Sequence, residues 1–541
     1  MLKLARARTN RAALAPQGDG SDLTGRTAHG SAVAISAQLA RVVVQFLALA
    51  GLARLLTPAD FGLVAMANAV TALSAVFIEP GVTLTTVQRR ELDQAASNIL
   101  FYASAAIGLV CMALLVALAP LAGWFFADDR VAGLVIALAA SIPVVAAGRQ
   151  HAAILRRTMR WKPLELSSLV GQAAGAVCAL ACAWFFHSGY MALVVQVWVA
   201  AVVTAGLLWW WCPWRPTLGF KGQAPGAVLG FGASFTLSQF LSYLQRQIDD
   251  ILIGWRWGAA PLGFYNRAYL LLAIPTQLIT APFNATIVPA LSRVQAEPER
   301  WRRIYLEALG LTAMVSSGIT AILIACSDAV ILITFGSHWD QSREIFLTLS
   351  VSLFSLNLLA TVNWIYVSLG RGKSLMVWSI VSTLALLLGF ALAIAGGPLA
   401  MARAYSGTML LLFLPGMFLA SRASPVSFAQ VLRQVAFPLG AGIASALFGR
   451  FLHGQLGLFA PIVSGVIVGL ATATLYGGAT VMIWRLDPCF DPVRQRTRRV
   501  MQDVLLRRKA GQAAKIRLNL AKFARSGPAR HRDDDGVGER H

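Results

Sequence analysis

Two arginines lie inside strongly apolar stretches of this 541-residue chain. Arg41 falls within residues 31–52, and Arg246 falls within residues 227–253, which are rich in Leu, Phe, Ile and Gly. A charge at the centre of a membrane helix costs roughly 2.5–3.5 kcal/mol on insertion scales, so each cation needs a partner, water or a ligand. The planar guanidinium donates paired hydrogen bonds to phosphate oxygens and stays protonated when buried. Both arginines are therefore candidates for anion binding, and structural pairing is the alternative for each.

Uncharged polar residues recur at helical spacing in the same stretches. Ser31, Gln38 and Gln45 are spaced by seven residues, and Arg41 follows Gln38 by three. Such a stripe marks a helix face that avoids lipid, either toward a cavity or toward a neighbouring helix. Besides the arginines, the candidates for a polar cavity are Gln38, Gln45, Gln239, Asn266, Gln277 and Asn284.

Acidic residues follow the second arginine in the segment SYLQRQIDDILIG. Asp249 and Asp250 come three and four residues after Arg246, so they share its helix face and can form a self-contained salt bridge with it. The alternatives are that these aspartates close a gate or hold a coupling cation. Glu79 and Arg267 complete the gate or coupling candidates. An interfacial position is the alternative for Glu79, and a contact between the two halves of the chain is the expected role of Arg267.

The composition predicts a membrane protein built from helices. The chain is 57% hydrophobic and 13% charged, with a mean hydropathy of +0.64. Apolar runs of about 20 residues, long enough to cross a bilayer, recur along most of it. We predict an all-α fold with fourteen transmembrane helices and short connections. The predicted spans are 31–52, 61–84, 97–120, 131–153, 164–186, 189–211, 227–253, 262–290, 304–326, 344–369, 374–395, 398–420, 434–453 and 457–484.

Basic residues are distributed unevenly around these spans. If the N-terminus is cytoplasmic, 36 of the 46 Lys and Arg residues lie in cytoplasmic loops and tails, and 6 lie on the opposite side. This is the positive-inside pattern, so the net charge of +22 reflects topology and not nucleic-acid binding. We expect both termini in the cytoplasm, with residues 1–30 as a disordered basic tail. The basic tail 485–541 is expected either to form an amphipathic helix on the membrane or to stay solvated.

No pattern in the sequence indicates catalysis. The phosphate-binding motif GxxxxGK[ST] is absent, so ATP is not the direct energy source. The six cysteines and seven histidines show no metal-ligand spacing. We therefore expect no enzymatic activity, no metal site and no cofactor.

A weak internal repeat relates the two halves of the chain. TPADFGLVAMA aligns with GAAPLGFYNRA, which pairs Gly62 with Gly263 at an offset of 201 residues. The same offset pairs Gln38 with Gln239 and covers six predicted spans, so the halves would be parallel repeats around an axis along the membrane normal. Such repeats are typical of transporters with a central cavity, and coincidence between apolar segments is the alternative.

Three motifs carry a resemblance to a known family. LARLLTPADFGLVAMANAV follows the first predicted span, LRRTMRWK the fourth and IVPALSRVQAEPERWRRIYLEAL the eighth. In this order, and with the hydropathy pattern over residues 31–485, they resemble the Wzx-type oligosaccharide flippases. These form the polysaccharide-export branch of the superfamily that also contains multidrug exporters and lipid II flippases. The resemblance implies a V-shaped cavity between two six-helix lobes, 31–212 and 225–420, with two further helices in 434–484.

The resemblance also implies a function. The expected substrate is a polyprenyl-pyrophosphate-linked oligosaccharide repeat unit, which is moved from the cytoplasmic to the periplasmic leaflet of the bacterial inner membrane for exopolysaccharide or lipopolysaccharide synthesis. The expected partners are this substrate, membrane lipids, and the polysaccharide polymerase and export machinery. One alternative is a cation-coupled multidrug exporter of the same superfamily. The other is a membrane glycosyltransferase or ligase, which the short internal loops disfavour.

The resemblance and the internal repeat together predict a specific role for the two arginines. The offset of 201 residues places the first and seventh spans in equivalent positions of the two lobes, and each span carries one arginine. A pyrophosphate must have its charge compensated in a low-dielectric setting. We predict that Arg41 and Arg246 bind it together, while the sugars occupy the polar cavity and the polyprenyl tail stays in lipid.

Overall fold

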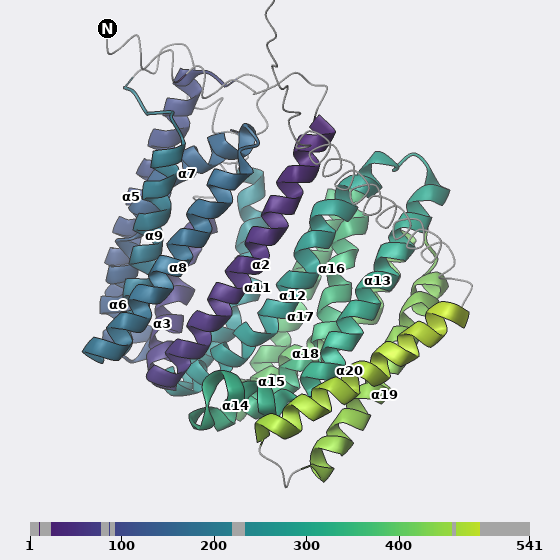
Figure 1. Ribbon diagram of the computed structural model, residues 1–541. Helices are drawn as coiled ribbons and strands as arrows, with labels where there is room; N and C mark the ends of the chain where they lie inside the picture. The colour runs from purple at the N-terminus through teal and green to yellow at the C-terminus, as the bar shows by residue number, and fades with distance from the viewer. Residues whose placement is uncertain are drawn as a thin grey trace, which may run out of the picture. The chain divides into compact units, whose positions relative to one another are not determined.

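The computed structural model describes residues 10, 23–76, 86, 92–218, 233–456 and 461–486, and its elements are all helical (Figure 1). By internal contacts the chain divides into two units, Met1–Gly477 and Gly478–His541, and the described part of the second unit is the end of α20. The helices are α2 (Leu23–Leu55), α3 (Pro58–Thr71), α5 (Gln94–Phe126), α6 (Asp129–Ala139), α7 (Ile142–Arg157), α8 (Trp161–Phe186), α9 (Met191–Trp211), α11 (Ala233–Trp257), α12 (Ala259–Arg293), α13 (Pro298–Ala325), α14 (Ser327–Phe335), η2 (Ser337–Trp339), α15 (Asp340–Ser350), α16 (Leu353–Ser368), α17 (Gly372–Ala393), η3 (Ile394–Gly396), α18 (Gly397–Arg422), α19 (Phe428–Gln455) and α20 (Pro461–Leu486).

Eleven segments of the described chain are long and apolar enough to cross a membrane, and the number becomes twelve if the bent pair Ser337–Ser350 and Leu353–Ser368 forms one span. The expectation of an all-helical, multi-pass membrane protein is thus confirmed. The prediction of fourteen spans differs from this count in two further places. The charged helix α11 is not among the eleven, and Gly372–Arg422 is a single 51-residue segment that contains both α17 and α18.

Local signals in the sequence set where helices begin. Thr57 caps α3 with a complete capping box, in which its backbone N–H donates to the Asp60 carboxylate at 2.9 Å. Pro58 follows at the first helical position, where a missing N–H costs nothing. Asp93 and Asp128 cap α5 and α6 with their side chains, which accept hydrogen bonds from the backbone N–H groups of Ala96 and Arg130. These caps satisfy backbone donors that a helix end leaves unpaired, so the chain can reverse direction over very few residues.

Buried apolar residues of the described chain form three large clusters. The largest draws on both halves and includes Leu52, Phe61 and Met66 together with Tyr265 and Trp339. The second is confined to residues 291–435, and the third to residues 92–214. Because consecutive long helices alternate in direction, the shared cluster lies at one end of the helices and the two separate clusters lie at the other end.

The two halves make a close reciprocal contact through α3 and α12. A Cβ atom placed on Gly62 would lie 1.7 Å from the carbonyl oxygen of Ala259, and one placed on Gly263 would lie 1.8 Å from that of Pro58. The offset of 201 residues maps Pro58 onto Ala259 and Gly62 onto Gly263. The two contacts therefore exchange equivalent residues, as a local two-fold axis between α3 and α12 requires. The glycines that defined the sequence repeat are the residues that let these backbones touch.

Candidate functional site

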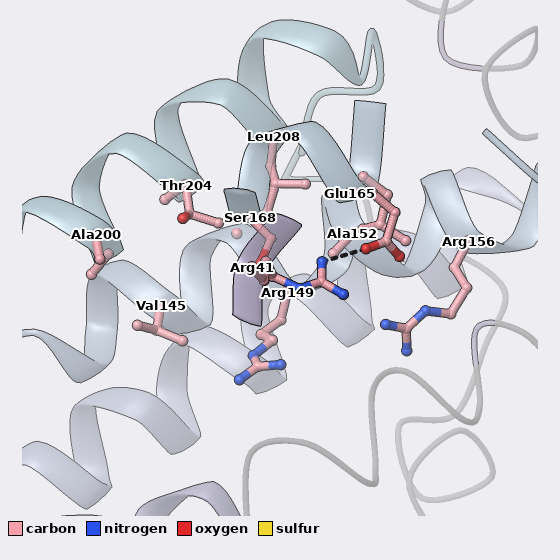
Figure 2. Close-up of a pocket in the computed structure, with 14 residues that line it drawn as sticks. Arg41, Val145, Arg149, Ala152, Arg156, Glu165, Ser168, Ala200, Thr204 and Leu208 are labelled. Carbon is pink, nitrogen blue, oxygen red and sulfur yellow. Dashed lines mark hydrogen bonds and ion pairs between the residues drawn. The ribbon is translucent and has the colours of Figure 1, made fainter. Parts of the chain in front are cut away.

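A pocket of about 430 Å³ lies among α2, α7, α8 and α9 (Figure 2). Small residues on α7 and α9 leave this space, and those in the lining are Gly148, Ala152, Ala200, Ala201 and Ala205. Nearby, the same helices pack closely, since a Cβ atom on Gly171 of α8 would lie 2.0 Å from Thr204 Oγ1 of α9. The pocket is a local opening within an otherwise close-packed group of helices.

Arg41 of α2 lies in this pocket beside the first turns of α8 (Figure 2). Its guanidinium forms an ion pair with Glu165, and its Nη2 donates a hydrogen bond to Gln38 Oε1 at 2.7 Å. The ion pair is largely shielded from solvent, with 21% of the Arg41 side chain and 14% of the Glu165 side chain exposed. Gln38 precedes Arg41 by one helical turn, so this member of the polar stripe predicted for the first span lies on the same helix face as Arg41.

Two further arginines, Arg149 and Arg156, line the pocket from α7. They are seven residues apart and therefore share one face of the helix. In Figure 2 the guanidinium groups of Arg149 and Arg156 lie below that of Arg41, and all three lie to the right of Ala200 and Val145. With three arginines and one glutamate, the 14 described lining residues carry a net charge of +2. This arrangement can compensate an anion with at least two negative charges, and guanidinium groups suit phosphate oxygens in particular.

The charge and spacing pattern of the sequence indicates only part of this site. It indicates Arg41 and Gln38, but not Arg149, Arg156 or Glu165. A signal existed for Arg156, because it lies in the motif LRRTMRWK that follows the fourth predicted span. No comparable signal marked Glu165, which stands next to the predicted boundary of the fifth span and so resembles an interfacial residue.

Arg246 of α11 does not line the pocket, and its side chain is exposed. Within the described part of the chain it forms no ion pair with Asp249 or Asp250, so the self-contained salt bridge is not the arrangement that the structure has. The structure also does not place Arg246 in one pocket with Arg41. Joint binding of a ligand by these two arginines stays a prediction.

Asp249 and Asp250 are buried between α11 and α12, with 3% of Asp249 and 8% of Asp250 exposed. The Tyr265 hydroxyl donates to Asp249 Oδ2 at 2.9 Å, and Asn266 Nδ2 donates to Asp250 Oδ2 at 2.8 Å. Both donors lie at the start of α12, so the aspartates join α11 to α12. Buried carboxylates require such donors, because an unpaired buried charge is strongly unfavourable.

Arg267 continues this polar cluster toward the other half of the chain. Its Nη2 donates to Asn266 Oδ1 at 3.0 Å, and its guanidinium lies 4.2 Å from the centre of the Phe61 ring on α3. A cation over an aromatic face is attracted by the ring quadrupole. Arg267 therefore does contact both halves, beside the glycine contact of α3 and α12.

The remaining sequence candidates lie apart from the pocket. Gln45 is half-buried on α2, and Gln277 is exposed on α12. Asn284 is also exposed on α12 and accepts a hydrogen bond from the indole N–H of Trp364. The side chain of Gln239 on α11 lies outside the described residues, and so does the whole of Glu79. Among the described residues, no group of three or more His, Cys, Asp or Glu side chains is placed to hold a metal ion.

Comparison with known proteins identifies the family of this chain. Residues 51–344 match a family model described as "Polysaccharide biosynthesis protein". This match covers more than half of the chain, and the protein belongs to this family.

Two relatives illustrate the family. The chain is 23% identical to the lipopolysaccharide biosynthesis protein WzxC of Escherichia coli over 54% of this chain and 59% of that protein. It is 24% identical to the succinoglycan biosynthesis transport protein ExoT of Rhizobium meliloti over 80% of this chain and 88% of that protein. The sequence resemblance to polysaccharide flippases is thereby confirmed.

Two solved structures share the fold. The lipid II flippase MurJ, in its inward closed conformation, aligns with a TM-score of 0.66 at 12% identity, over 84% of this chain and 99% of that one. An inward-facing multidrug transporter of the MATE family aligns with a TM-score of 0.53 at 15% identity, over 77% of this chain and 99% of that one. At these identities the likeness concerns the fold alone.

Proposed function

We propose that this protein flips polyprenyl-pyrophosphate-linked oligosaccharide repeat units from the cytoplasmic to the periplasmic leaflet of the bacterial inner membrane, for exopolysaccharide or lipopolysaccharide synthesis. Membership of the polysaccharide biosynthesis family and the flippase-like fold support a transporter of this class and not an enzyme. The names of the relatives, which include a transport protein for succinoglycan biosynthesis, point to the same kind of cargo.

The observation that carries the substrate assignment is the arginine-lined pocket. A pyrophosphate diester has two negative charges, and the lining of the pocket has a net charge of +2. Paired, charge-assisted hydrogen bonds from guanidinium groups are suited to phosphate oxygens, and they are strongest where water is scarce. Arg41, Arg149 and Arg156 would bind the pyrophosphate, and the exposed Arg246 would meet it from the other lobe. The lipid tail would remain in the bilayer.

The proposed architecture has fourteen spans in two six-helix lobes around a V-shaped cavity. The eleven candidate segments become fourteen spans if the bent pair counts as one span, if α17 and α18 count separately and if α11 is included. The shared apolar cluster at one end, with separate clusters at the other, supports a cavity closed at a single end. The distribution of basic residues supports an open end toward the cytoplasm, with both termini on that side.

A multidrug exporter has the same fold and is the second candidate. The charge of the pocket argues against it, because a net positive lining repels organic cations. The polymerase and export machinery of the polysaccharide remain expected partners, since they consume the flipped repeat unit.

The test is deletion of the gene followed by complementation. The deletion should abolish one cell-surface polysaccharide while its lipid-linked repeat units accumulate in the inner leaflet, and the intact gene should restore the polymer. Complementation with Arg41→Ala should fail although the protein is present in the membrane. A deletion strain with normal polysaccharide and a new sensitivity to drugs would instead favour the multidrug exporter.

A further inference from the structure

The ion pair between Arg41 and Glu165 occupies the site that the proposed substrate would need. Glu165 is the only carboxylate among the 14 residues that line the pocket. It stands one turn inside α8, and its side chain is more shielded from solvent than that of Arg41. A carboxylate in contact with a guanidinium uses the same N–H donors that a phosphate would use.

The charged groups around Glu165 come from three helices. Arg41 lies on α2, Arg149 and Arg156 line the pocket from α7, and Lys162 precedes Glu165 by three residues on α8 with an exposed side chain. The part of α9 that lines the pocket contributes only uncharged residues. Among the described lining residues, Glu165 is therefore the one negative charge beside three arginines, and it lowers the net charge of the empty pocket.

Two further titratable groups lie on α7, and neither lines the pocket. Arg157 donates to the carbonyl oxygen of Thr86 at 2.9 Å. His151 faces an apolar cluster. Its ring stacks on Trp209 with 4.4 Å between centroids and also contacts Trp214, in the apolar cluster confined to residues 92–214. It does not line the pocket. Of the lining residues that the structure describes, only Glu165 can therefore compete with an anion for Arg41.

We propose that Glu165 is an internal competitor of the substrate pyrophosphate: it holds Arg41 while the pocket is empty, is displaced when the pyrophosphate binds, and recaptures Arg41 when the pyrophosphate leaves. This inference rests on the proposed function. Glu165 is a positioning residue, because it acts on the substrate through Arg41. The competition weakens binding and accelerates release, so a flippase gains turnover at the cost of affinity.

The first measurement is binding of farnesyl diphosphate to the purified full-length protein in detergent. Glu165→Gln removes the competing charge and keeps the shape of the side chain, so it should tighten binding about fivefold, the size expected from a partly shielded ion pair. Glu299→Gln is the matched control, because Glu299 forms an exposed ion pair with Arg302 at 2.8 Å outside the pocket. It should leave the affinity unchanged.

The second measurement separates competition from a merely structural role. If Glu165 acts through Arg41, then Glu165→Gln should have no effect on affinity in a protein that already carries Arg41→Ala. In cells, Glu165→Gln should bind substrate more tightly yet export polysaccharide more slowly, whereas a structural defect would weaken both. Should Glu165→Gln not fold, Glu165→Asp provides the same test, since its shorter carboxylate competes less well and should tighten binding about twofold.

The outcomes distinguish this inference from the function on which it rests. If the wild-type protein does not bind farnesyl diphosphate, the proposed function is contradicted, and so is the competitor role of Glu165 that rests on it. If the wild-type protein binds and Glu165→Gln binds equally well or more weakly, only the competitor role of Glu165 is overturned, and the proposed function stands. Tighter binding by Glu165→Gln in the Arg41→Ala background also overturns the competitor, because Glu165 would then act on the substrate without Arg41.

Discussion

Arg41 is held by two side chains of different character, and this gives a prediction for its replacement. Under the proposed function, Arg41→Ala removes charge-assisted hydrogen bonds to the pyrophosphate, each worth about 1.5–3 kcal/mol, so export should fall at least about tenfold. Arg41→Lys keeps the charge but loses the planar fork, so it should retain part of the activity. The measurement is surface polysaccharide per amount of protein in the membrane. Arg302→Ala, which breaks an exposed ion pair, is the control and should export normally.

Arg246 and the two aspartates allow a second prediction. Arg246→Ala should stop export if this exposed cation meets the substrate. The rival explanation is that Arg246 only balances the charges of Asp249 and Asp250. Under that explanation, replacing all three with neutral polar residues would restore export. We expect no restoration, because the aspartates already receive hydrogen bonds from Tyr265 and Asn266.

At this scale the sequence was informative where a charge broke an apolar run. Arg41 stood out for that reason, and the spacing of Gln38 correctly indicated a shared helix face. Arg149, Arg156 and Glu165 stand near the ends of their predicted spans, where charges are ordinary. Their convergence depends on how α7 and α8 pack against α2 and α9, which no local pattern encodes.

The helices α3 and α12 meet through glycines, and this contact can be tested by adding a single methyl group. Gly62→Ala would place a Cβ atom 1.7 Å from a backbone oxygen, so the two helices would have to move apart. Overpacking of this kind costs about 1–3 kcal/mol, and the Tm of the purified protein should fall. Gly206→Ala on α9 is the matched control, because its Cβ atom would meet nothing within 4 Å. An equal Tm for Gly62→Ala and the wild type would show that this contact does not hold the two halves together.

Element positions were predictable to a useful degree because apolar periodicity and caps are local. The repeat TPADFGLVAMA and GAAPLGFYNRA correctly singled out Gly62 and Gly263, although sequence identity between the halves is thin. The number of spans is harder to predict. Helix α11 is too polar to be recognised as a membrane span from its composition. It nevertheless packs against α12 and α17, as a helix inside the bundle would.

In the first unit, three features support the proposed transporter with a cavity closed at one end. The two halves share one apolar cluster there, and the glycine contact and the contact of Arg267 with Phe61 lie in the same region. The arginine-lined pocket lies toward the other end, near the cluster confined to residues 92–214. If the proposed substrate binds in the pocket, we expect that it reaches the opposite leaflet only when the contact of α3 and α12 separates.

The orientation of this unit in the membrane gives the last prediction. Lys and Arg resist transfer across the membrane during insertion, so the side with 36 of them should be cytoplasmic.

Exposed side chains suited to a labelling test are available on both sides. They are Asp129 and His338 on the predicted outer side, and Lys162 and Arg303 on the predicted inner side. Single cysteines placed at these four positions, in a protein without its native cysteines, should report the orientation. A membrane-impermeant maleimide added to intact cells with a permeabilised outer membrane should label Asp129→Cys and His338→Cys. Lys162→Cys and Arg303→Cys should react only after the inner membrane is opened. Labelling at Arg303→Cys in intact inner membranes would reverse the orientation and place the arginine-lined pocket on the side from which the substrate leaves.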